Sequence, residues 1–344
     1  MTDEPDNPYL RLFREIAEEV VIKDAFTFTH PRFGILEPPR DMAAGDGHPV
    51  VTYLAKLIYL SYYAGDDAAA RILMDGGKAV ATIPDYEDYA FSEQLHGHNA
   101  GRGHFTPGWR ITGYDEQGFL VHADGITLRA TPQELVATGP DGELTVGAPV
   151  SVRFPPSMRY ALLGWYLAIG DQGVAEREDG LVRVYFSLDG HSGAPVLMKA
   201  VTSTLNTLEI PFQFKMANHP AAYARRDAGV LFLSSEAWSR HRTTLLEMCA
   251  QARAVLRDDY PRLALPLAFG VSFAVEPQVP GRLLSFGEHR CLLVAEALVE
   301  AHERGVGDAA GRLAAIRDRY EREGLSVETP YAEPVPVSVS VPVP

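Results

Sequence analysis

Cysteine is scarce in this chain of 344 residues, which contains only Cys249 and Cys291. Each lies inside an apolar stretch with helical periodicity. Two isolated thiols of this kind supply neither a disulfide framework nor a cysteine-based metal site. We therefore expect both to be buried free thiols.

Long apolar runs and an excess of positive charge are also absent. No stretch reaches the roughly 20 apolar residues that a membrane-spanning helix needs, and the N-terminal MTDEPDNPYL lacks the pattern of a secretion signal. The formal net charge is −14, which argues against nucleic acid or an anionic membrane as partner. We expect a cytoplasmic protein, in which a small basic pocket is still possible.

Familiar cofactor motifs are missing as well. The sequence contains no Gly-Lys-Ser phosphate loop, no dinucleotide fingerprint after a strand and no helical histidine pair of the metalloprotease type. His96, His98 and His104 lie close together, but no cysteine or carboxylate constellation completes a metal site around them. We expect a glycine-rich loop with left-handed turns there, and neither a metal nor another cofactor.

Hydrophobic periodicity predicts an α+β chain. We expect a helical N-terminal segment over residues 1–85, a β-rich segment with an antiparallel meander over 86–170, and a mixed α/β core over 171–330, all in one continuous globular unit. The last residues, 331–344, are a Pro/Val tail that cannot pack.

Individual elements follow from the same patterns. YLRLFREIAEEVVI and VVTYLAKLIYLSYY read as helices, and residues 29–49 between them read as a loop. Strands are expected in LVRVYFSL, PFQFKMA and GVLFLS, with a helix in APVLMKAVTSTLNTLE. A helix capped by Ser235 follows, and two more are expected at 287–304 and 308–323.

Residues 210–233, IPFQFKMANHPAAYARRDAGVLFL, combine strand-like apolar runs with charged residues. Lys215 lies inside one run, and Arg225, Arg226 and Asp227 precede the next. Charged side chains are rarely buried without a partner or a task. Either these residues lie on a solvated face, with Lys215 extending from a strand end, or they form a site for an anion and a base.

Several segments together resemble the HopA-type type III effectors of plant pathogens and their bacterial homologues. Besides residues 210–233, they are NAGRGHFTPGW, FPPSMRYALLGWYLAIGD, RVYFSLDG, GAPVLMKAVTSTLN, FGVSFAVEP, SFGEHRCLLVAEALVEA and EGLSVETPYAEP. The resemblance runs in chain order from about residue 50 to residue 334. The chain departs from the family pattern at His219, in the fewer glycines of FGVSFAVEP and in the Pro/Val tail.

The resemblance implies one of two contexts. Some members are secreted effectors, whereas others act in the biosynthesis of ribosomally made peptides, namely class V lanthipeptides and thioamide-containing peptides. In the second context it implies a lyase that works with an aminoglycoside-phosphotransferase-like kinase. The kinase phosphorylates Ser or Thr of a precursor peptide, and the lyase eliminates phosphate to give dehydroalanine or dehydrobutyrine. Abundant Ala, Arg and Gly and the absence of a polar, Ser-rich N-terminus favour this branch.

Such an elimination needs a base for the α-proton, stabilisation of the developing enolate oxygen, and cations that hold the phosphate. Lys215 is our candidate base, because burial and nearby cations lower the pKa of a lysine. Arginine is the natural phosphate ligand, since its planar fork gives two hydrogen bonds at once. The candidates are Arg225, Arg183, Arg159 and Arg290. For Arg226 we expect an ordinary salt bridge, and for Asp227 a role in orienting Arg225 or capping the turn.

The remaining roles are less defined by the sequence. His219, Tyr223, Tyr185 and His191 are candidates for the catalytic acid that protonates the leaving phosphate. Aromatic side chains beside glycines could line a peptide groove or pack in the core. These substrate-binding candidates are Trp109, Trp165, Tyr166 and Tyr185.

Two other functions remain open. A HopA-like scaffold would bind the peptide or the kinase without chemistry, so its lysine and arginines would scatter and an exposed apolar patch would be present. A lyase would instead bring Lys215 and at least two arginines within reach of one phosphate. A phosphatase would use the same arginines, but neither a metal constellation nor a cysteine nucleophile supports it.

Overall fold

The computed structural model describes residues 7–39, 48–74, 86–176, 180–279 and 284–334. They form an α+β fold, which confirms the predicted class. The helices are α1 (Pro8–Glu19), α2 (Pro49–Leu57), α3 (Asp67–Met74), α5 (Tyr89–His98), α6 (Ala194–Thr207), α7 (Ser235–Gln251), α8 (Phe286–Glu303) and α9 (Ala309–Arg322). In this part of the chain, no helix has the apolar length to cross a bilayer.

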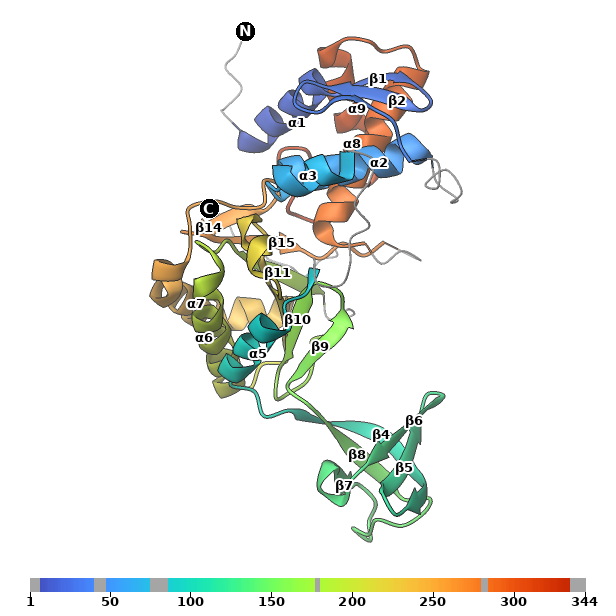
Figure 1. Ribbon diagram of the computed structural model, residues 1–344, viewed down its shortest axis with the longest axis vertical. Coiled ribbons are helices and arrows are strands. Elements are labelled where there is room, and N and C mark those ends of the chain that lie inside the picture. Colours follow the sequence, from blue (N-terminus) through green and yellow to red (C-terminus); the bar gives the residue numbers. More distant parts are fainter. Residues whose placement is uncertain (1–6, 40–47, 75–85, 177–179, 280–283, 335–344) are drawn as a thin grey trace.

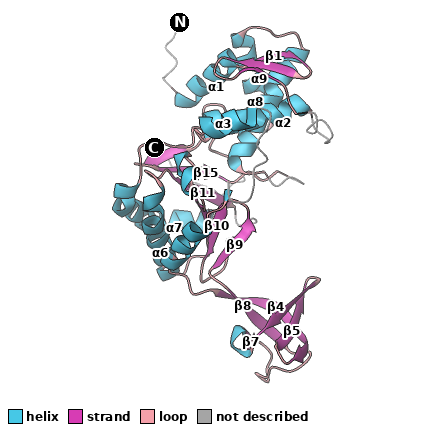
Figure 2. Ribbon diagram, viewed as in Figure 1, coloured by secondary structure: helices cyan, strands magenta, loops and turns pink. Residues whose placement is uncertain are grey.

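The described strands form three antiparallel sheets (Figures 1 and 2). The first has the order β1 (Val21–Asp24), β2 (Thr27–His30), β3 (Gly34–Leu36). The central sheet has the order β14 (Leu265–Ala268), β15 (Val271–Val275), β11 (Leu181–Phe186), β13 (Gly229–Ser234), β12 (Gln213–Ala217), β10 (Trp165–Ile169), β9 (Ser157–Leu162). The third has the order β6 (Ile126–Ala130), β5 (Gly118–Ala123), β4 (His104–Asp115), β8 (Pro149–Phe154), β7 (Leu135–Ala137).

Different elements cover the two faces of the central sheet. Helices α5, α6 and α7 lie along one side (Figure 1), where the ring of Trp238 on α7 packs 5.2 Å from that of Phe273 on β15. The opposite face meets the segment after α2 and the start of α8, because Tyr185 on β11 contacts Tyr63 and Phe286. Helices α5, α6 and α7 therefore cover one face of the central sheet, whereas aromatic and charged residues meet on its other face.

The N-terminal part differs from its sequence prediction. We expected one helix to continue through Ile22, but α1 ends at Glu19 and β1 begins at Val21. The β-branched residues at this point favour an extended backbone over a helix. The predicted loop, residues 29–49, contains the end of β2 and all of β3, whose apolar Leu36 is buried in the core.

The C-terminal elements agree closely with prediction, since α6, α7, α8 and α9 and strands β11, β12 and β13 all occupy the expected positions. The cap of α7 is an exception. The Ser234 hydroxyl, not that of Ser235, accepts from the backbone N–H of Ala237 at 3.1 Å. Ser235 lies inside the helix and donates to the Gly180 carbonyl at 2.7 Å.

The third sheet has a hydrophobic cluster of its own, which includes Trp109 and Val150. It lies at the far end of the molecule from α1 and α9 (Figure 1). Strands β9 and β10 follow it in sequence but join the central sheet. Both cysteines are buried and free, as expected. The start of the predicted tail does pack, because Tyr331 lies in the core and Glu333 pairs with the buried Arg290, and residues 335–344 lie outside the described residues.

Candidate functional site

The alternation of strand residues places Lys215 and Arg183 on the same face of the central sheet. Lys215 on β12 is opposite Val230 on β13, and Val230 is opposite Tyr185 on β11. Directly opposed residues point to the same side of an antiparallel sheet, as do residues two apart in one strand. Arg183 is two residues before Tyr185 and therefore shares this face.

Lys215 is enclosed by an aromatic ring and by charged groups. Its Nζ lies 3.8 Å from the ring centroid of Trp165 on β10, which is a cation–π contact. Burial, followed by the positive charge of Arg183, lowers the pKa of Lys215 to about 8, and Asp227 opposes this shift. The amine forms no hydrogen bond with the residues that the structure describes. A substantial fraction is therefore neutral near physiological pH, as a base requires.

Arg225 faces the same ring and is held by a carboxylate. Its guanidinium carbon lies 5.7 Å from the ring centroid of Trp165. Two of its nitrogens, Nε and Nη2, donate to the two oxygens of Asp227, each at 2.9 Å. Burial disfavours the Asp227 carboxylate, but the Arg225 charge outweighs it and lowers the pKa of Asp227. Asp227 thus orients Arg225, and Nη1 has no partner within the described residues.

Arg183 is also held by a carboxylate, as Arg225 is. Its Nε and Nη2 both donate to the carboxylate of Glu276, the second bond being 2.8 Å long. Both side chains are buried, and the guanidinium carbon stacks 4.6 Å from the ring centroid of Phe232. The pairing fixes the plane of the guanidinium. Again, Nη1 has no partner in the described part of the chain.

A π-helix over Ile58–Tyr63 covers this face of the sheet. The rings of Tyr59 and Tyr63 stack at 5.2 Å, and the Tyr59 hydroxyl donates to Asp227 at 2.7 Å. At the start of α8, a Cβ on Gly287 would lie 2.5 Å from the Tyr63 ring and 2.7 Å from the Tyr59 ring. Only glycine permits this approach. π-Helical turns are frequently found at functional sites.

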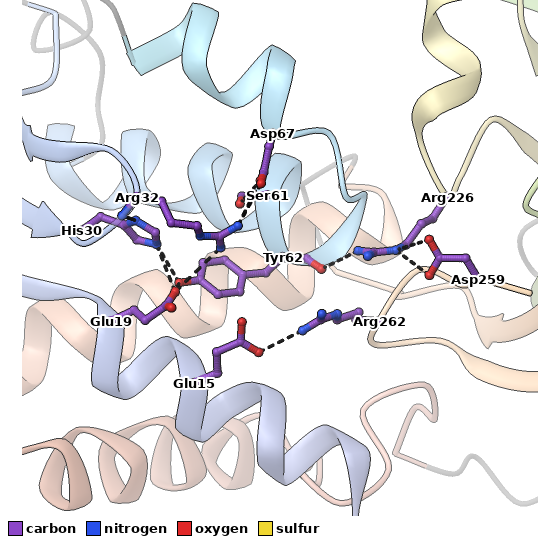
Figure 3. Close-up of polar contacts among 10 residues, drawn as sticks. All are labelled: Glu15, Glu19, His30, Arg32, Ser61, Tyr62, Asp67, Arg226, Asp259 and Arg262. Carbon is purple, nitrogen blue, oxygen red and sulfur yellow. Dashed lines mark hydrogen bonds and ion pairs between the residues drawn. The ribbon is translucent and has the colours of Figure 1, made fainter.

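Polar contacts anchor the other side of the π-helix (Figure 3). The hydroxyl of Tyr62 lies 2.7 Å from Nε2 of His30 and also contacts Glu19. Arg226 forms the expected ion pair, with Asp259 at 2.8 Å, and donates to the Tyr62 carbonyl at 3.2 Å. These contacts hold the turn that directs Tyr59 and Tyr63 toward the sheet.

The structure thus brings together five of the predicted site residues, namely Lys215, Arg225, Arg183, Trp165 and Tyr185. Arg290 and Arg159 lie elsewhere. Arg290 is fully buried, and its donors are used by the carbonyls of Pro330 and Ala332 and by Glu333. It joins α8 to the C-terminal segment and leaves no nitrogen for a phosphate.

Arg159 is on β9, one residue beyond Met158. Because Met158 is opposite Leu167 and Leu167 is opposite Lys215, Arg159 belongs to the other face of the sheet. There it forms an ion pair with Glu93 of α5. Its position does not support phosphate binding beside Lys215.

The three remaining acid candidates also lie away from Lys215. The buried Tyr223 donates its hydroxyl to the Ala217 carbonyl at 2.7 Å, and Nδ1 of His219 accepts from the N–H of Ala221 as a cap. His191 packs against Phe91, as Tyr223 does. Tyr223, His219 and His191 therefore have structural contacts of their own, and none of these contacts is with Lys215.

Two aromatic candidates are part of the packing. Trp109 is 8% exposed and belongs to the core of the third sheet. Tyr166 is buried, and its hydroxyl lies 3.0 Å from Nδ1 of His96 and 3.1 Å from Nδ2 of Asn99. Of the aromatic residues predicted to bind substrate, Trp165 and Tyr185 are the two that reach the site.

The histidine segment does not form a metal site. The residues that the structure describes contain no group of three or more His, Cys, Asp or Glu suited to a metal ion. His98 bonds its own helix at the Gln94 carbonyl, and His104 stacks on Phe154. Gly103 has a φ of 93°, a left-handed turn of the kind that the sequence predicted.

Several residues that complete the site were not predicted from the sequence. Tyr59, Tyr63, Glu276 and Phe286 come from segments far from residues 210–233. For Tyr59 and Tyr63 the sequence did contain an indication, because four tyrosines in VVTYLAKLIYLSYY are unusual on one short helix. Glu276 is the penultimate residue of FGVSFAVEP, where a carboxylate after a buried strand requires a cationic partner.

Comparisons with known proteins identify a family. A model described as the HopA1 effector protein family matches residues 159–332, which is about half of the chain and includes every residue of the site except Tyr59 and Tyr63. No curated protein sequence matches the chain.

Two solved structures are similar to this chain. The effector protein from Pseudomonas syringae pv. tomato strain DC3000 is 12% identical, with a TM-score of 0.43 over 83% of this chain and 99% of that one. The effector protein from Pseudomonas syringae pv. syringae strain 61 is 14% identical, with a TM-score of 0.43 over 81% and 96% of the two chains.

Proposed function

Because the chain belongs to the HopA1 effector protein family, we propose that it is a metal-independent phosphoserine/phosphothreonine lyase of the biosynthetic branch that the sequence resembles. Its substrate is a ribosomal precursor peptide phosphorylated by an aminoglycoside-phosphotransferase-like kinase. One observation carries the proposal: Lys215 and Arg225 both contact the ring of Trp165, and Arg183 lies on the same face of the sheet as Lys215.

The proposed reaction is an elimination. The neutral amine of Lys215 takes the α-proton, and the electrons of the Cα–H bond form the Cα–Cβ double bond. The Cβ–O bond breaks, and its electron pair leaves with the phosphate. The resulting ammonium of Lys215 returns its proton to the phosphate or to water. Phosphate is a fair leaving group, so Arg183 and Arg225 contribute mainly by stabilising its charge.

The residues around the base support this role. Trp165 stabilises the ammonium that forms when Lys215 accepts the proton, because the face of an indole ring attracts a cation. The carboxylates of Asp227 and Glu276 fix the two guanidinium planes through Nε and Nη2 and do not bond the Nη1 of either arginine. A preorganised site of this kind needs little rearrangement during the reaction.

A second candidate function is binding without chemistry, and one surface favours it. The edge strand β9 exposes Met158, Tyr160 and Leu162, at 47%, 59% and 43%, and Tyr89 of α5 packs against Tyr160 at 5.9 Å. Exposed apolar side chains on a strand edge are suited to an extended peptide. A scaffold would use this surface alone, whereas a lyase would use it beside Lys215.

The test is mass spectrometry of a precursor peptide phosphorylated by the partner kinase and incubated with the protein. We expect loss of phosphoric acid and an alkene that adds a thiol. Lys215→Ala is expected to leave the phosphopeptide unchanged. Tight binding of an unreacted phosphopeptide by the wild-type protein would instead support the scaffold, and a serine or threonine product would identify a phosphatase.

A further inference from the structure

Two buried hydroxyls in the central sheet make no hydrogen bond of good geometry with the residues that the structure describes, although one of them, that of Tyr185, lies close enough to Tyr63 and Arg183 for both to affect its pKa. They belong to Tyr185 on β11 and Ser272 on β15, which are 2% and 1% exposed. A buried hydroxyl without a partner has lost its hydrogen bonds to water and gained none in return. Folded proteins keep few such groups, so two in neighbouring strands indicate a ligand that supplies the missing acceptor.

Both hydroxyls belong to the face of the sheet that carries Lys215. Ser272 is opposite Tyr185, Tyr185 is opposite Val230, and Val230 is opposite Lys215. These four residues form one row across β15, β11, β13 and β12. At a strand spacing of about 4.8 Å, the backbone of Tyr185 is ~10 Å from that of Lys215. A substrate side chain bound at Lys215 would have to extend along this row, past Val230, to reach the hydroxyls.

A cation accompanies the hydroxyls. Arg183 shares the strand and the face of Tyr185, and Glu276 holds its Nε and Nη2. Its Nη1 has no partner in the described ranges. Burial raises the pKa of Tyr185 to about 12, which keeps its hydroxyl protonated and able to donate at neutral pH. One guanidinium nitrogen and two hydroxyls are the donors that a tetrahedral oxyanion accepts.

We propose that Arg183, Tyr185 and Ser272 form an inner oxyanion subsite that holds the phosphate of the substrate and then the free phosphate that leaves. The inference rests on the proposed function and deepens it, because it assigns a direction to the substrate. The α-carbon lies at Lys215, and the phosphate lies along the row toward β11 and β15. Ser272, which no sequence motif indicated, becomes a phosphate-binding residue.

The experiment measures binding of inorganic phosphate to the full chain by isothermal titration calorimetry at constant ionic strength. The variants are Ser272→Ala, Tyr185→Phe and the double variant. Ser92→Ala is the matched control, because the Ser92 hydroxyl on α5 is also buried without a partner but lies outside the candidate site. Melting temperatures and elimination rates with a phosphorylated peptide are recorded for each protein.

We expect each single variant to bind phosphate at least tenfold more weakly and the double variant at least a hundredfold more weakly. Because neither removed hydroxyl makes a hydrogen bond of good geometry within the protein, the melting temperatures should change little. Ser92→Ala should bind phosphate like the wild-type protein. Phosphate affinities within twofold of wild type in Ser272→Ala and Tyr185→Phe would overturn the subsite, as would the absence of phosphate binding by the wild-type protein.

The two proposals fail in different ways. If the wild-type protein eliminates phosphate from the peptide but the variants bind inorganic phosphate normally, the subsite is wrong and the proposed function stands. If phosphate binding depends on the two hydroxyls but the wild-type protein leaves the phosphopeptide intact, the proposed function is wrong and the subsite stands.

Discussion

Arg225 and Asp227 form a two-point ion pair, with the Arg225 Nε and Nη2 each 2.9 Å from a different oxygen of the carboxylate. The Tyr59 hydroxyl donates to the same carboxylate at 2.7 Å. The side chains of Arg225 and Asp227 are 18% and 5% exposed, so this ion pair is shielded from solvent. Its geometry links the loop before β13 to the π-helix, and it orients the guanidinium beside Lys215.

Removing the charge of Asp227 while keeping that of Arg225 should lower the stability of the fold. In Asp227→Asn, the Arg225 charge stays buried without its counter-charge, and we expect the free energy of unfolding to fall by about 3 kcal/mol. Urea denaturation measures the change. The double variant Arg225→Met with Asp227→Leu removes both charges and should recover most of the loss. A double variant as unstable as Asp227→Asn would show that the charge pair is not the cause.

The pH dependence of elimination should report Lys215. Its pKa is lowered to about 8 by burial and then by Arg183, and the neutral amine is the active form. The rate constant should therefore rise with pH and level off above pH ~8. Lys215→Arg, which retains a charge but cannot deprotonate, should lose about 10²–10⁴-fold. A Lys215→Arg variant with the wild-type rate and pH profile would exclude this lysine as the base.

The same lysine should also affect stability in a pH-dependent way. Its pKa in the folded state is below the value near 10.4 of an unfolded chain, so between pH ~8 and ~10 the folded state holds fewer protons. Lys215 therefore contributes a gain in stability as pH rises through this window, which is measured as the difference between the wild-type protein and Lys215→Met. Lys215→Met should lack this gain and should be more stable than wild type at pH 7, by roughly 1–3 kcal/mol. Urea denaturation of both proteins at pH 7 and 10 is the measurement, and identical pH dependence would contradict it.

Arg290 should be a structural residue. It is fully buried and bonds two backbone carbonyls and Glu333 of the C-terminal segment. Arg290→Lys loses the planar fork, and we expect the free energy of unfolding to fall by about 3 kcal/mol. Arg240→Lys, in an exposed pair with Glu236, is the control and should cost less than 0.5 kcal/mol.

Kinetics separate this role from phosphate binding. At temperatures where Arg290→Lys remains folded, its KM for the phosphopeptide and the pH midpoint of elimination should match those of wild type. A selective rise in KM with unchanged stability would return Arg290 to the site.

The fold could be predicted where one physical signal dominates. Apolar residues with helical spacing located α6, α8 and α9, and alternation located β11 and β12. The short strands β1–β3 were missed, because a three- or four-residue strand carries too little alternation to separate it from a loop. The π-helix at Ile58–Tyr63 was missed too, since its sequence continues the helical pattern of α2.

The site was predictable to a similar extent. A lysine inside an apolar strand was a visible anomaly in the sequence, but the strand pairing that places Lys215, Arg183 and Tyr185 on one face is seen only in the structure. Tyr59, which bonds Asp227, and Glu276, which bonds Arg183, come from distant segments. Only the folded chain brings them to the site. Arg290 was misread because a buried cation that binds backbone carbonyls looks, in sequence, like one available to a ligand.

The central claim is that Lys215 removes the α-proton while phosphate leaves. A peptide that carries phosphoserine deuterated at the α-carbon tests it most directly, by mass spectrometry of the product from the wild-type protein and from Lys215→Met. We predict dehydroalanine without the α-deuterium, formed more slowly than from the unlabelled peptide, and no reaction with Lys215→Met. A serine product that keeps its α-deuterium, or equal elimination by Lys215→Met, would contradict the account.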